Sequence, residues 1–313
     1  MQGVTLNNLS YLHLDRNLLS GPIPAEIGNM KSLQNLSLHS NNLFGLIPNE
    51  LGNLKKLNHL GLSNNQLSGP IPRGRIPHSL ENCQRLEVVD LGDNLLNDTF
   101  AMWLGTLPKL QVLSLRSNKL HGPIRTSRFS KNLFPRLQII DLASNAFSAE
   151  LPVILFQNLE AMKRVNQTLN ESSNTGDGLY TAVDFSSNRF EGDIPGIMGD
   201  LIALRVLNLS HNELEGHIPT SLGNLPSVES LDRSSNHLEG KIPEQLTSLT
   251  LLEFLNLYYN QLQGCIPTGP QFATFEKDSY TANKQMLGGA FGGMVIGNAI
   301  ISGAGAYVAG FDF

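Results

Sequence analysis

Residues 204–219 read LRVLNLSHNELEGHIP and contain the unit from which most of this chain is built. The first half follows the pattern L-x-x-L-x-L-x-x-N, in which apolar and polar residues alternate with a period of two, as in a half-buried strand. Asn212 follows the expected end of that strand. Its side-chain amide can accept a hydrogen bond from a backbone N–H and donate one to a backbone carbonyl where the chain turns. Gly216 and Pro219 then predict a turn away from the strand.

The same unit occurs ten times in one fixed register. Six of the nine intervals between copies are 24 residues long, and the others are 29, 27 and 43. A single unit cannot bury its apolar face alone, whereas stacking the next unit on it buries that face and pairs the strand edges. The regular spacing therefore predicts a solenoid. The first positions of the ten copies are Leu9, Leu33, Leu57, Leu86, Leu110, Leu137, Tyr180, Leu204, Val228 and Leu252.

The predicted fold is an α/β solenoid with a curved parallel sheet of ten strands on its concave face. Turns and short 3-10 segments are expected on the convex face, where Gly and Pro direct the chain. The ninth position is Asn in every copy, which predicts a structural ladder of stacked amides. Its members are Asn17, Asn41, Asn65, Asn94, Asn118, Asn145, Asn188, Asn212, Asn236 and Asn260.

These motifs resemble the plant-specific leucine-rich repeat of 24 residues. The stretches NLFPRLQIIDLASNAFSAELP, TAVDFSSNRFEGDIP and GPQFATFEKDSY are similar to the C-terminal ectodomain of plant receptor-like proteins of the tomato leaf-mould-resistance type. The resemblance implies a cell-surface immune receptor without a kinase, anchored in the plasma membrane with its repeats on the extracellular face. It also implies that the repeats sense a peptide, protein or glycan ligand and signal through a receptor-like kinase as co-receptor.

The breaks in the repeat suggest five segments. Repeats one to six occupy residues 1–160, a polar loop-out or island occupies 161–179, and repeats seven to ten occupy 180–274. Residues 275–285 are similar to the start of a C-terminal cap, and 286–313 form a Gly- and Ala-rich apolar tail. Residues 286–310 carry no charge and are long enough to span a membrane, although a Gly-rich tail without that role fits the same composition. The first residues lack the features of a signal peptide, so a fragment or truncated form is expected.

Side chains at the outward positions of the strands should form a wide, rigid concave surface that can bind a ligand. Three histidines lie near one end of this surface, but they lack the spacing of metal ligands, so neither a metal nor a cofactor is predicted. Asp90, Asp141, Asp184 and Asp232 recur at one repeat position and could form an acidic row. The ligand-contact candidates are Tyr11, His13, His39, His59, Asp90, Arg116, Asp141 and Asp184.

The last repeat places three aromatic residues together, a composition typical of protein interfaces. The resemblance puts co-receptor contact at this end, while an alternative is that the aromatics cover an unfinished C-terminal core. The partner-contact candidates are Glu253, Phe254, Asn256, Tyr258 and Tyr259. Sequons make Asn8, Asn35, Asn97, Asn166, Asn170 and Asn208 glycosylation candidates.

Other functions find little support in the sequence. The net charge of −5 without a block of Lys and Arg does not suit nucleic acid, and no catalytic motif occurs, so no enzyme is predicted. A secreted inhibitor similar to polygalacturonase-inhibiting proteins, which share about ten such repeats, stays open as an alternative. So does a truncated gene product without a function of its own.

Two local features stand apart from the pattern. Arg233 occupies an inward position held by Leu or Phe in other copies, where it should either reach solvent, find a local partner or destabilise the fold. Cys83 and Cys265 are about seven strand spacings apart, too far for a disulfide, so both are expected to be free packing residues.

Overall fold

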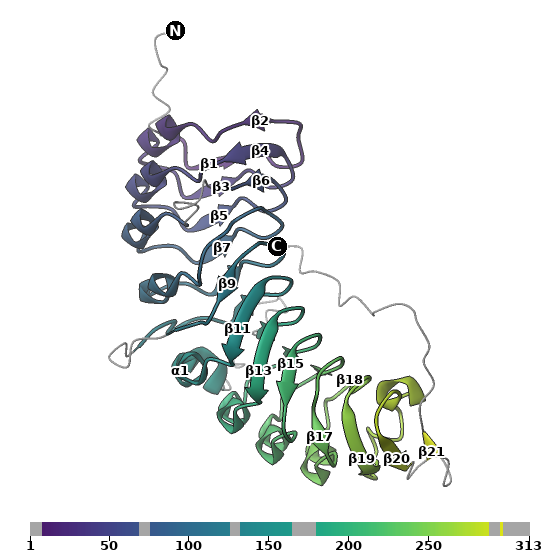
Figure 1. The fold of residues 1–313 in the computed structure, drawn as a ribbon. Helices are drawn as coiled ribbons and strands as arrows, with labels where there is room; N and C mark the ends of the chain where they lie inside the picture. Colours follow the sequence, from purple (N-terminus) through teal and green to yellow (C-terminus); the bar gives the residue numbers. More distant parts are fainter. Residues whose placement is uncertain (1–7, 69–75, 126–131, 165–179, 288–294, 297–313) are drawn as a thin grey trace.

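A computed structural model describes residues 8–68, 76–125, 132–164, 180–287 and 295–296. Ten short strands form one parallel sheet in which every strand lies beside the strand of the next repeat. The chain is therefore an α/β solenoid, as the sequence predicts, and it curves into an arc (Figure 1). These strands are β1 Tyr11–His13, β3 Asn35–Ser37, β5 His59–Gly61, β7 Val88–Asp90, β8 Val112–Ser114, β10 Ile139–Asp141, β12 Ala182–Asp184, β14 Val206–Asn208, β16 Ser230–Asp232 and β18 Phe254–Asn256.

Short helices follow the outer side of the arc (Figure 1). Most begin directly after the Pro of the G-x-I-P motif, because Pro fixes the backbone that enters the helix. Successive helices pack so closely that a Cβ on Gly52 would overlap the backbone of the next repeat. The helices are η1 Ala25–Asn29, η2 Asn49–Asn53, η3 His78–Asn82, η4 Met102–Thr106, α1 Val153–Asn158, η5 Glu160–Lys163, η6 Gly196–Asp200, η7 Thr220–Asn224, η8 Glu244–Ser248 and η9 Lys277–Tyr280.

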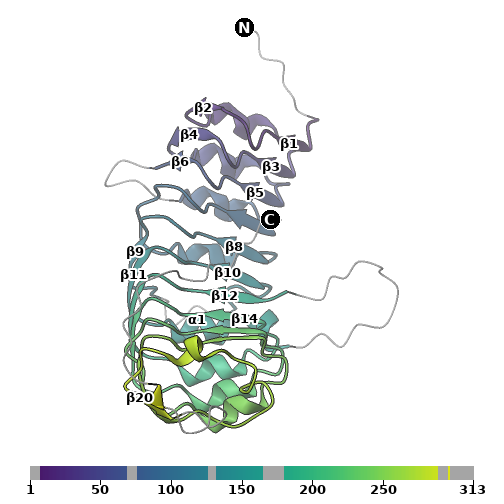
Figure 2. The ribbon, with the colours of Figure 1, turned by 90° about the vertical axis from the view of Figure 1, so that its right-hand side faces the viewer.

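A second set of strands runs along one flank of the solenoid, where the sequence predicts only turns. Figure 2 shows them beside the main sheet. Most of them form because the segment after a ladder Asn extends and pairs in parallel with the same segment of the next repeat, until a Gly with positive φ such as Gly216 turns the chain. Among the described residues no such strand follows Asn94, and β21 pairs antiparallel with β20. They are β2 Ser20–Gly21, β4 Asn42–Gly45, β6 Gln66–Leu67, β9 His121–Gly122, β11 Ala146–Glu150, β13 Arg189–Asp193, β15 Glu213–Glu215, β17 Glu239–Gly240, β19 Gln261–Cys265, β20 Gln285–Leu287 and β21 Val295–Ile296.

The core is a continuous column of leucines between the sheet and the outer helices. The first, fourth and sixth positions of the central repeats are fully buried, for example Leu110, Leu113 and Leu115. Aromatic rings replace some leucines in the middle of the molecule, where Phe185 packs on Phe190 with ring centroids 5.6 Å apart. Each repeat buries its apolar side chains against its two neighbours, so the stability of the fold is shared along the column.

The ladder extends one turn further than the ten predicted copies. Asn283 lies nine positions into an eleventh unit that starts at Phe275, and its amide donates to the carbonyls of Leu257 and Tyr280 at 3.0 and 2.8 Å. Phe272, Phe275, Tyr280 and Met286 are buried there and close the end of the core. The alternative that the aromatics of repeat ten cover an unfinished core is therefore wrong.

Arg233 is fully buried at its inward position. None of its three guanidinium nitrogens has a hydrogen-bond partner in the described part of the chain. Burial lowers the pKa of this side chain to about 9, and the nearby carboxylate of Asp232 offsets only part of that effect. The alternatives that Arg233 reaches solvent or finds a local partner are both wrong.

The two cysteines are free, as predicted. Cys83 is buried, and its thiol donates to the carbonyl of Leu51 at 3.4 Å. Cys265 is exposed at the end of β19, so the expectation that it packs in the core is wrong. The pattern could not show this, because β19 belongs to the flank strands rather than to the leucine column.

Candidate recognition surface

The last residues of the main strands form one row along the concave face. Strand register places these residues side by side: Asp90 is opposite Ser114, Ser114 is opposite Asp141, and Asp141 is opposite Asp184. Neighbouring strands are about 4.8 Å apart, so the row is closely spaced. Its ten members are His13, Ser37, Gly61, Asp90, Ser114, Asp141, Asp184, Asn208, Asp232 and Asn256.

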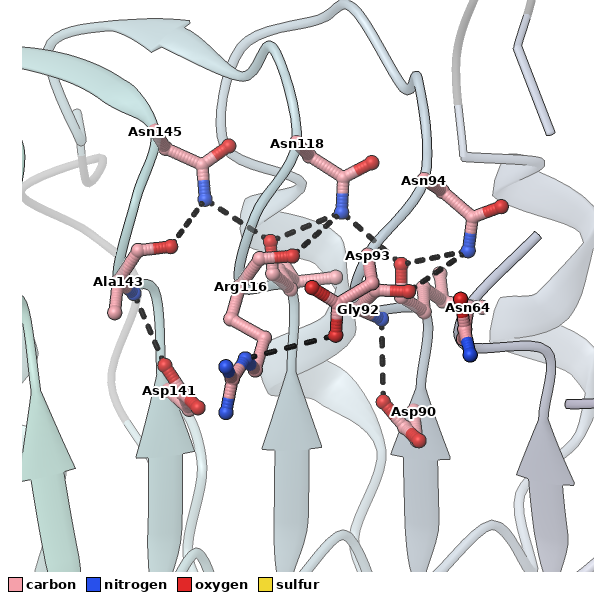
Figure 3. A network of polar contacts seen from close by, with 12 residues as sticks. Asn64, Asp90, Gly92, Asp93, Asn94, Arg116, Asn118, Asp141, Ala143 and Asn145 are labelled. Atoms are coloured by element: carbon pink, nitrogen blue, oxygen red, sulfur yellow. Dashed lines mark hydrogen bonds and ion pairs between the residues drawn. The ribbon is translucent and has the colours of Figure 1, made fainter. Parts of the chain in front are cut away.

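The carboxylates of this row also close the turns after their strands. Asp141 accepts a hydrogen bond from the backbone N–H of Ala143 at 3.0 Å, and Asp90 accepts one from Gly92 at 3.1 Å (Figure 3). Asp184 accepts bonds from both the N–H and the hydroxyl of Ser186. Asp is favoured here because its short side chain reaches the backbone two residues on.

Asp141 and Asp184 form a pair of like charges in which Asp141 is buried and Asp184 is half-buried. Asp141 is only 3% exposed, and burial together with the neighbouring carboxylate of Asp184 raises the pKa of Asp141 to about 7. Burial raises the pKa of Asp184 as well, against hydrogen bonds from Ser186 and Asn208 that favour its ionised form. Asp141 therefore changes its charge near neutral pH.

Arg116 lies over the row from the turn after β8 Val112–Ser114. Its Nε is 3.7 Å from a carboxylate oxygen of Asp93, and its side chain passes above Gly92, where no Cβ blocks the way (Figure 3). Its charge favours the ionised forms of Asp141 and Asp184. Arg116 thus offsets part of the negative charge in the middle of the concave face.

A short apolar row lies beside these polar groups. The first residue of each strand contributes Val112, Ile139, Ala182 and Val206, which occupy consecutive places in the register. Ile139, Ala182 and Val206 form a small buried cluster of their own, separate from the leucine core. Sequence reasoning missed this row, although the apolar third positions of repeats four to eight were a signal for it.

The histidines of the first three repeats lie at the N-terminal end of the sheet, on or beside β1, β3 and β5. His39 is 3.5 Å from a carboxylate oxygen of Asp15, and the rings of Tyr11 and His13 are 6.3 Å apart. Burial lowers the pKa of His59, and the charge of Asp90 acts against that shift. The described residues contain no group of three or more ligands arranged to hold a metal ion.

The partner-contact candidates stay together on the last strand and its turn. Tyr259 is 60% exposed, and its ring lies 6.0 Å from that of Tyr258. Phe254 is half-buried and Glu253 is exposed. Asn256 donates to Asp232 at 3.3 Å and accepts from the N–H of Tyr258, so it shapes this patch rather than standing free on it.

Each central ladder amide joins two repeats. Asn212 donates to the carbonyls of Leu209 and Ser210 in its own turn and to Phe185 in the preceding repeat, all at 3.1 Å. Its oxygen accepts from the N–H of Phe190 at 3.0 Å. Figure 3 shows the amide nitrogens of Asn94, Asn118 and Asn145 donating to backbone carbonyls in the same way. In the described part of the chain, the first amide, Asn17, donates only within its own turn.

The sequons fall in different environments. Asn8 is exposed and Asn97 is half-buried outside the strands and helices, whereas Asn35 and Asn208 lie on main strands of the concave face. Asn208 is 8% exposed, and its oxygen accepts from Ser210. Asn166 and Asn170 lie outside the described residues, as does most of both the island and the apolar tail.

In the part of the chain that the structure describes, no helix is long and apolar enough to cross a bilayer.

The fold, the amide ladder and the concave rows together define a class of protein. Models of the leucine-rich repeat family match residues 8–30, 32–54, 56–83 and 181–238. The chain thus has the fold of the leucine-rich repeat class.

Within that class, the chain is similar to the receptor-like proteins of plants. It is 40% identical over 161 residues to Receptor-like protein 34 of Arabidopsis thaliana, an alignment that covers 44% of this chain and 16% of that protein. Its identity to Receptor-like protein 43 of the same plant is 39%, covering 42% of this chain and 21% of the relative. The chain thus spans a small part of the length of these relatives. The predicted similarity to plant receptor-like proteins is confirmed.

Solved ectodomains of receptor kinases share the same solenoid. The chain is 33% identical to the Arabidopsis thaliana membrane receptor kinase GASSHO1/SCHENGEN3, crystallised with CASPARIAN STRIP INTEGRITY FACTOR 2. The TM-score is 0.77, and the match covers 90% of this chain and 30% of that one. The Arabidopsis receptor kinase HAESA, in complex with the peptide hormone IDA and the co-receptor SERK1, is 26% identical with a TM-score of 0.65. This match covers 93% of this chain and 52% of that one.

Proposed function

We propose that this chain is the ligand-recognition part of a plant cell-surface receptor-like protein and that its concave face binds an extended peptide. The observation that carries the proposal is the pair of adjacent rows on strands β7 to β14. One row offers the carboxylates of Asp90, Asp141 and Asp184, and the other offers the apolar side chains of Val112 and its neighbours. An extended peptide presents alternate side chains to a surface in this way.

The chemistry of the rows defines the peptide. A Lys or Arg side chain would lie over Asp141 and Asp184, where burial makes the pairing of opposite charges strong. An apolar side chain would lie over Ile139 and Val206. Among the similar structures, HAESA was solved with a peptide hormone, which supports a peptide over a glycan as the ligand class.

The partners and the location of the protein follow from the same proposal. The aromatic patch around Tyr258 and Tyr259 would contact a receptor-like kinase as co-receptor, since exposed aromatic residues are enriched in interfaces. The presence of SERK1 in the HAESA complex supports a co-receptor of this kind. The protein would act outside the cell as a receptor without catalytic activity, held at the plasma membrane.

The test uses a library of extended synthetic peptides and the full chain. Peptides that carry one Lys or Arg beside apolar residues should be enriched over versions in which that cation is Gln. The double variant Asp141→Asn/Asp184→Asn should weaken binding by about tenfold or more, because a charge-assisted pair is lost. The control Asp193→Asn/Asp200→Asn removes the same charge from other strands and helices and should bind normally. Equal retention of the Gln versions would contradict the proposal.

A further inference from the structure

A row of exposed cations runs along the edge where the main strands begin. Lys56, Arg85, Lys109 and Arg136 occupy the same position in four consecutive repeats, one residue before the leading leucines of repeats three to six. All four side chains are exposed. We call these four residues the basic row.

The backbone fixes the spacing of the basic row. Two residues further on, the N–H of Glu87 donates to the carbonyl of Asn58 at 2.7 Å, and Gln111 donates to Glu87 at 2.8 Å. Gln138 continues this ladder by donating to Gln111 at 2.8 Å. The four cations therefore start from backbones that are stacked at about the strand spacing of 5 Å and extend over roughly 15 Å.

Other side chains neutralise little of this charge. Among the described residues, the one ion pair made by the row is between Lys109 and Glu87, whose charged atoms are 4.0 Å apart. Lys31 and Lys55 lie nearby, but their ammonium groups donate to the carbonyls of Gly28 and Gly52 at 2.6 and 2.9 Å. Like charges at neighbouring strands repel one another, so the row carries a cost that a bound anion would remove.

The concentration of positive charge in the basic row is not explained by the overall composition of the protein. The net charge is −5, so the chain as a whole repels anions. Repeats eight to ten carry Ala203, Ser227 and Leu251 at the equivalent position. The flank strands of the later repeats are acidic instead, with Glu191 directly opposite Glu213. The unbroken run of cations at this one position therefore occurs in repeats three to six.

We propose that the basic row binds a linear polyanion with regularly spaced carboxylates, namely an acidic polysaccharide of linked hexuronate sugars. Such a chain carries one carboxylate per sugar, at intervals similar to the distance between strands, so each cation can meet one sugar. A line of charges on a curved edge matches a linear polymer better than the plane of a bilayer. The row lies outside the two concave rows, so it does not depend on the peptide proposed above.

Binding of this kind should depend strongly on salt. Each contact between a cation of the row and a carboxylate releases counterions from the polymer, and the charges are exposed to solvent. The row should therefore hold the polysaccharide well at low ionic strength and release most of it as the salt concentration rises.

The experiment measures binding of the full chain to an immobilised oligogalacturonate. The row variant replaces Lys56, Arg85, Lys109 and Arg136 with Gln, and the control variant replaces Lys119, Arg189, Lys241 and Lys277 with Gln, which changes the net charge equally. The row variant should lose about tenfold or more in affinity, and the control variant less than about twofold. Raising the salt from about 50 to about 300 mM should weaken binding of the unchanged protein sharply.

Several results would overturn the proposal. Equal losses in the two variants would show a general charge effect, and no binding of the unchanged protein would exclude the polysaccharide. Tighter binding to vesicles of anionic lipid or to duplex DNA, lost in the row variant, would assign the row to that partner instead. Neither variant should melt below the unchanged protein, because all eight side chains are exposed, and this shows that the fold is intact.

Discussion

At the scale of single residues, a charged side chain that departs from the repeat pattern or lies beside a like charge lowers the free energy of unfolding. Arg233 is the clearest case, because a charged side chain stands among leucines without a hydrogen-bond partner in the described structure. The Asp141 and Asp184 pair is a second case, in which a buried carboxylate lies beside a half-buried one. At Arg233 a charged residue occupies a repeat position that favours an apolar one. At Asp141 and Asp184 the stacking of repeats brings two negative charges together away from solvent.

Replacing Arg233 with Leu should stabilise the protein. The change restores the residue type of the other repeats and removes an unpaired buried charge, with a gain of about 1–4 kcal/mol in the free energy of unfolding. Thermal melting of the full chain measures it as a higher melting temperature. Arg189→Leu, at an exposed position, is the control and should change little. An unchanged or lower melting temperature for Arg233→Leu would contradict the prediction.

The Asp141→Asn variant should change how stability depends on pH. Because the pKa of Asp141 is higher in the folded chain than its ordinary value of 3.8, the folded state binds more protons between about pH 4 and 7. Stability from this group is present below about pH 4 and is lost as the pH rises through about 7. The amide of the variant stays neutral at every pH, so the variant should melt higher than the unchanged protein at about pH 8, with a smaller difference at about pH 4. Asp200→Asn, which is exposed, should show no such pH dependence.

At the scale of elements, the ladder amides determine how each strand ends and the next repeat begins. The period-two pattern and the fixed Asn were enough to predict the ten main strands and their order. The flank strands could not be predicted, because their pairing depends on the neighbouring repeat and on turns with positive φ. The eleventh unit keeps the ladder residue, Asn283. It was missed because Asp278 stands where the pattern needs an apolar residue.

Removing a ladder amide should cost most in the middle of the solenoid. Asn212→Ala removes one of the two hydrogen bonds that each of three carbonyls accepts and leaves the N–H of Phe190 without its partner, which should destabilise the fold by about 1–3 kcal/mol. Asn17→Ala removes only two exposed bonds within one turn and should cost less than about 1 kcal/mol. Urea unfolding compares the two. Equal losses would mean that the bonds between repeats contribute nothing beyond the local turn.

At the scale of the whole molecule, the candidate surface depends on register rather than on any one motif. The row of aspartates was predictable from their common repeat position. The apolar row beside them was not recognised, because Val112, Ile139 and Val206 are far apart in sequence and meet only when the strands stack. The burial of Asp141 was missed for the same reason, since it arises from neighbours in adjacent repeats.

Protection against hydrogen exchange should fall toward the first repeat. In the described structure β1 pairs with β3 alone, whereas β10 lies between β8 and β12. Tyr11 in β1 is 62% exposed, and Leu14 directly after it is 40% exposed. In a solenoid each repeat is stabilised by its neighbours, so an end repeat opens more easily. Mass spectrometry of the full chain in deuterated water should show faster exchange at residues 11–16 than at 139–144. Uniform protection would mean that the repeats open only as one unit.

The amide ladder has a consequence for how such a gene can change. Asn212 joins its repeat to the one before it through the same bonds that Asn188 and Asn236 make one step away. A whole repeat can therefore be duplicated or deleted by unequal crossing-over, and the joints on either side still match. Length and surface can diversify among descendants in steps of one repeat, while the chemistry that keeps neighbours together is inherited intact.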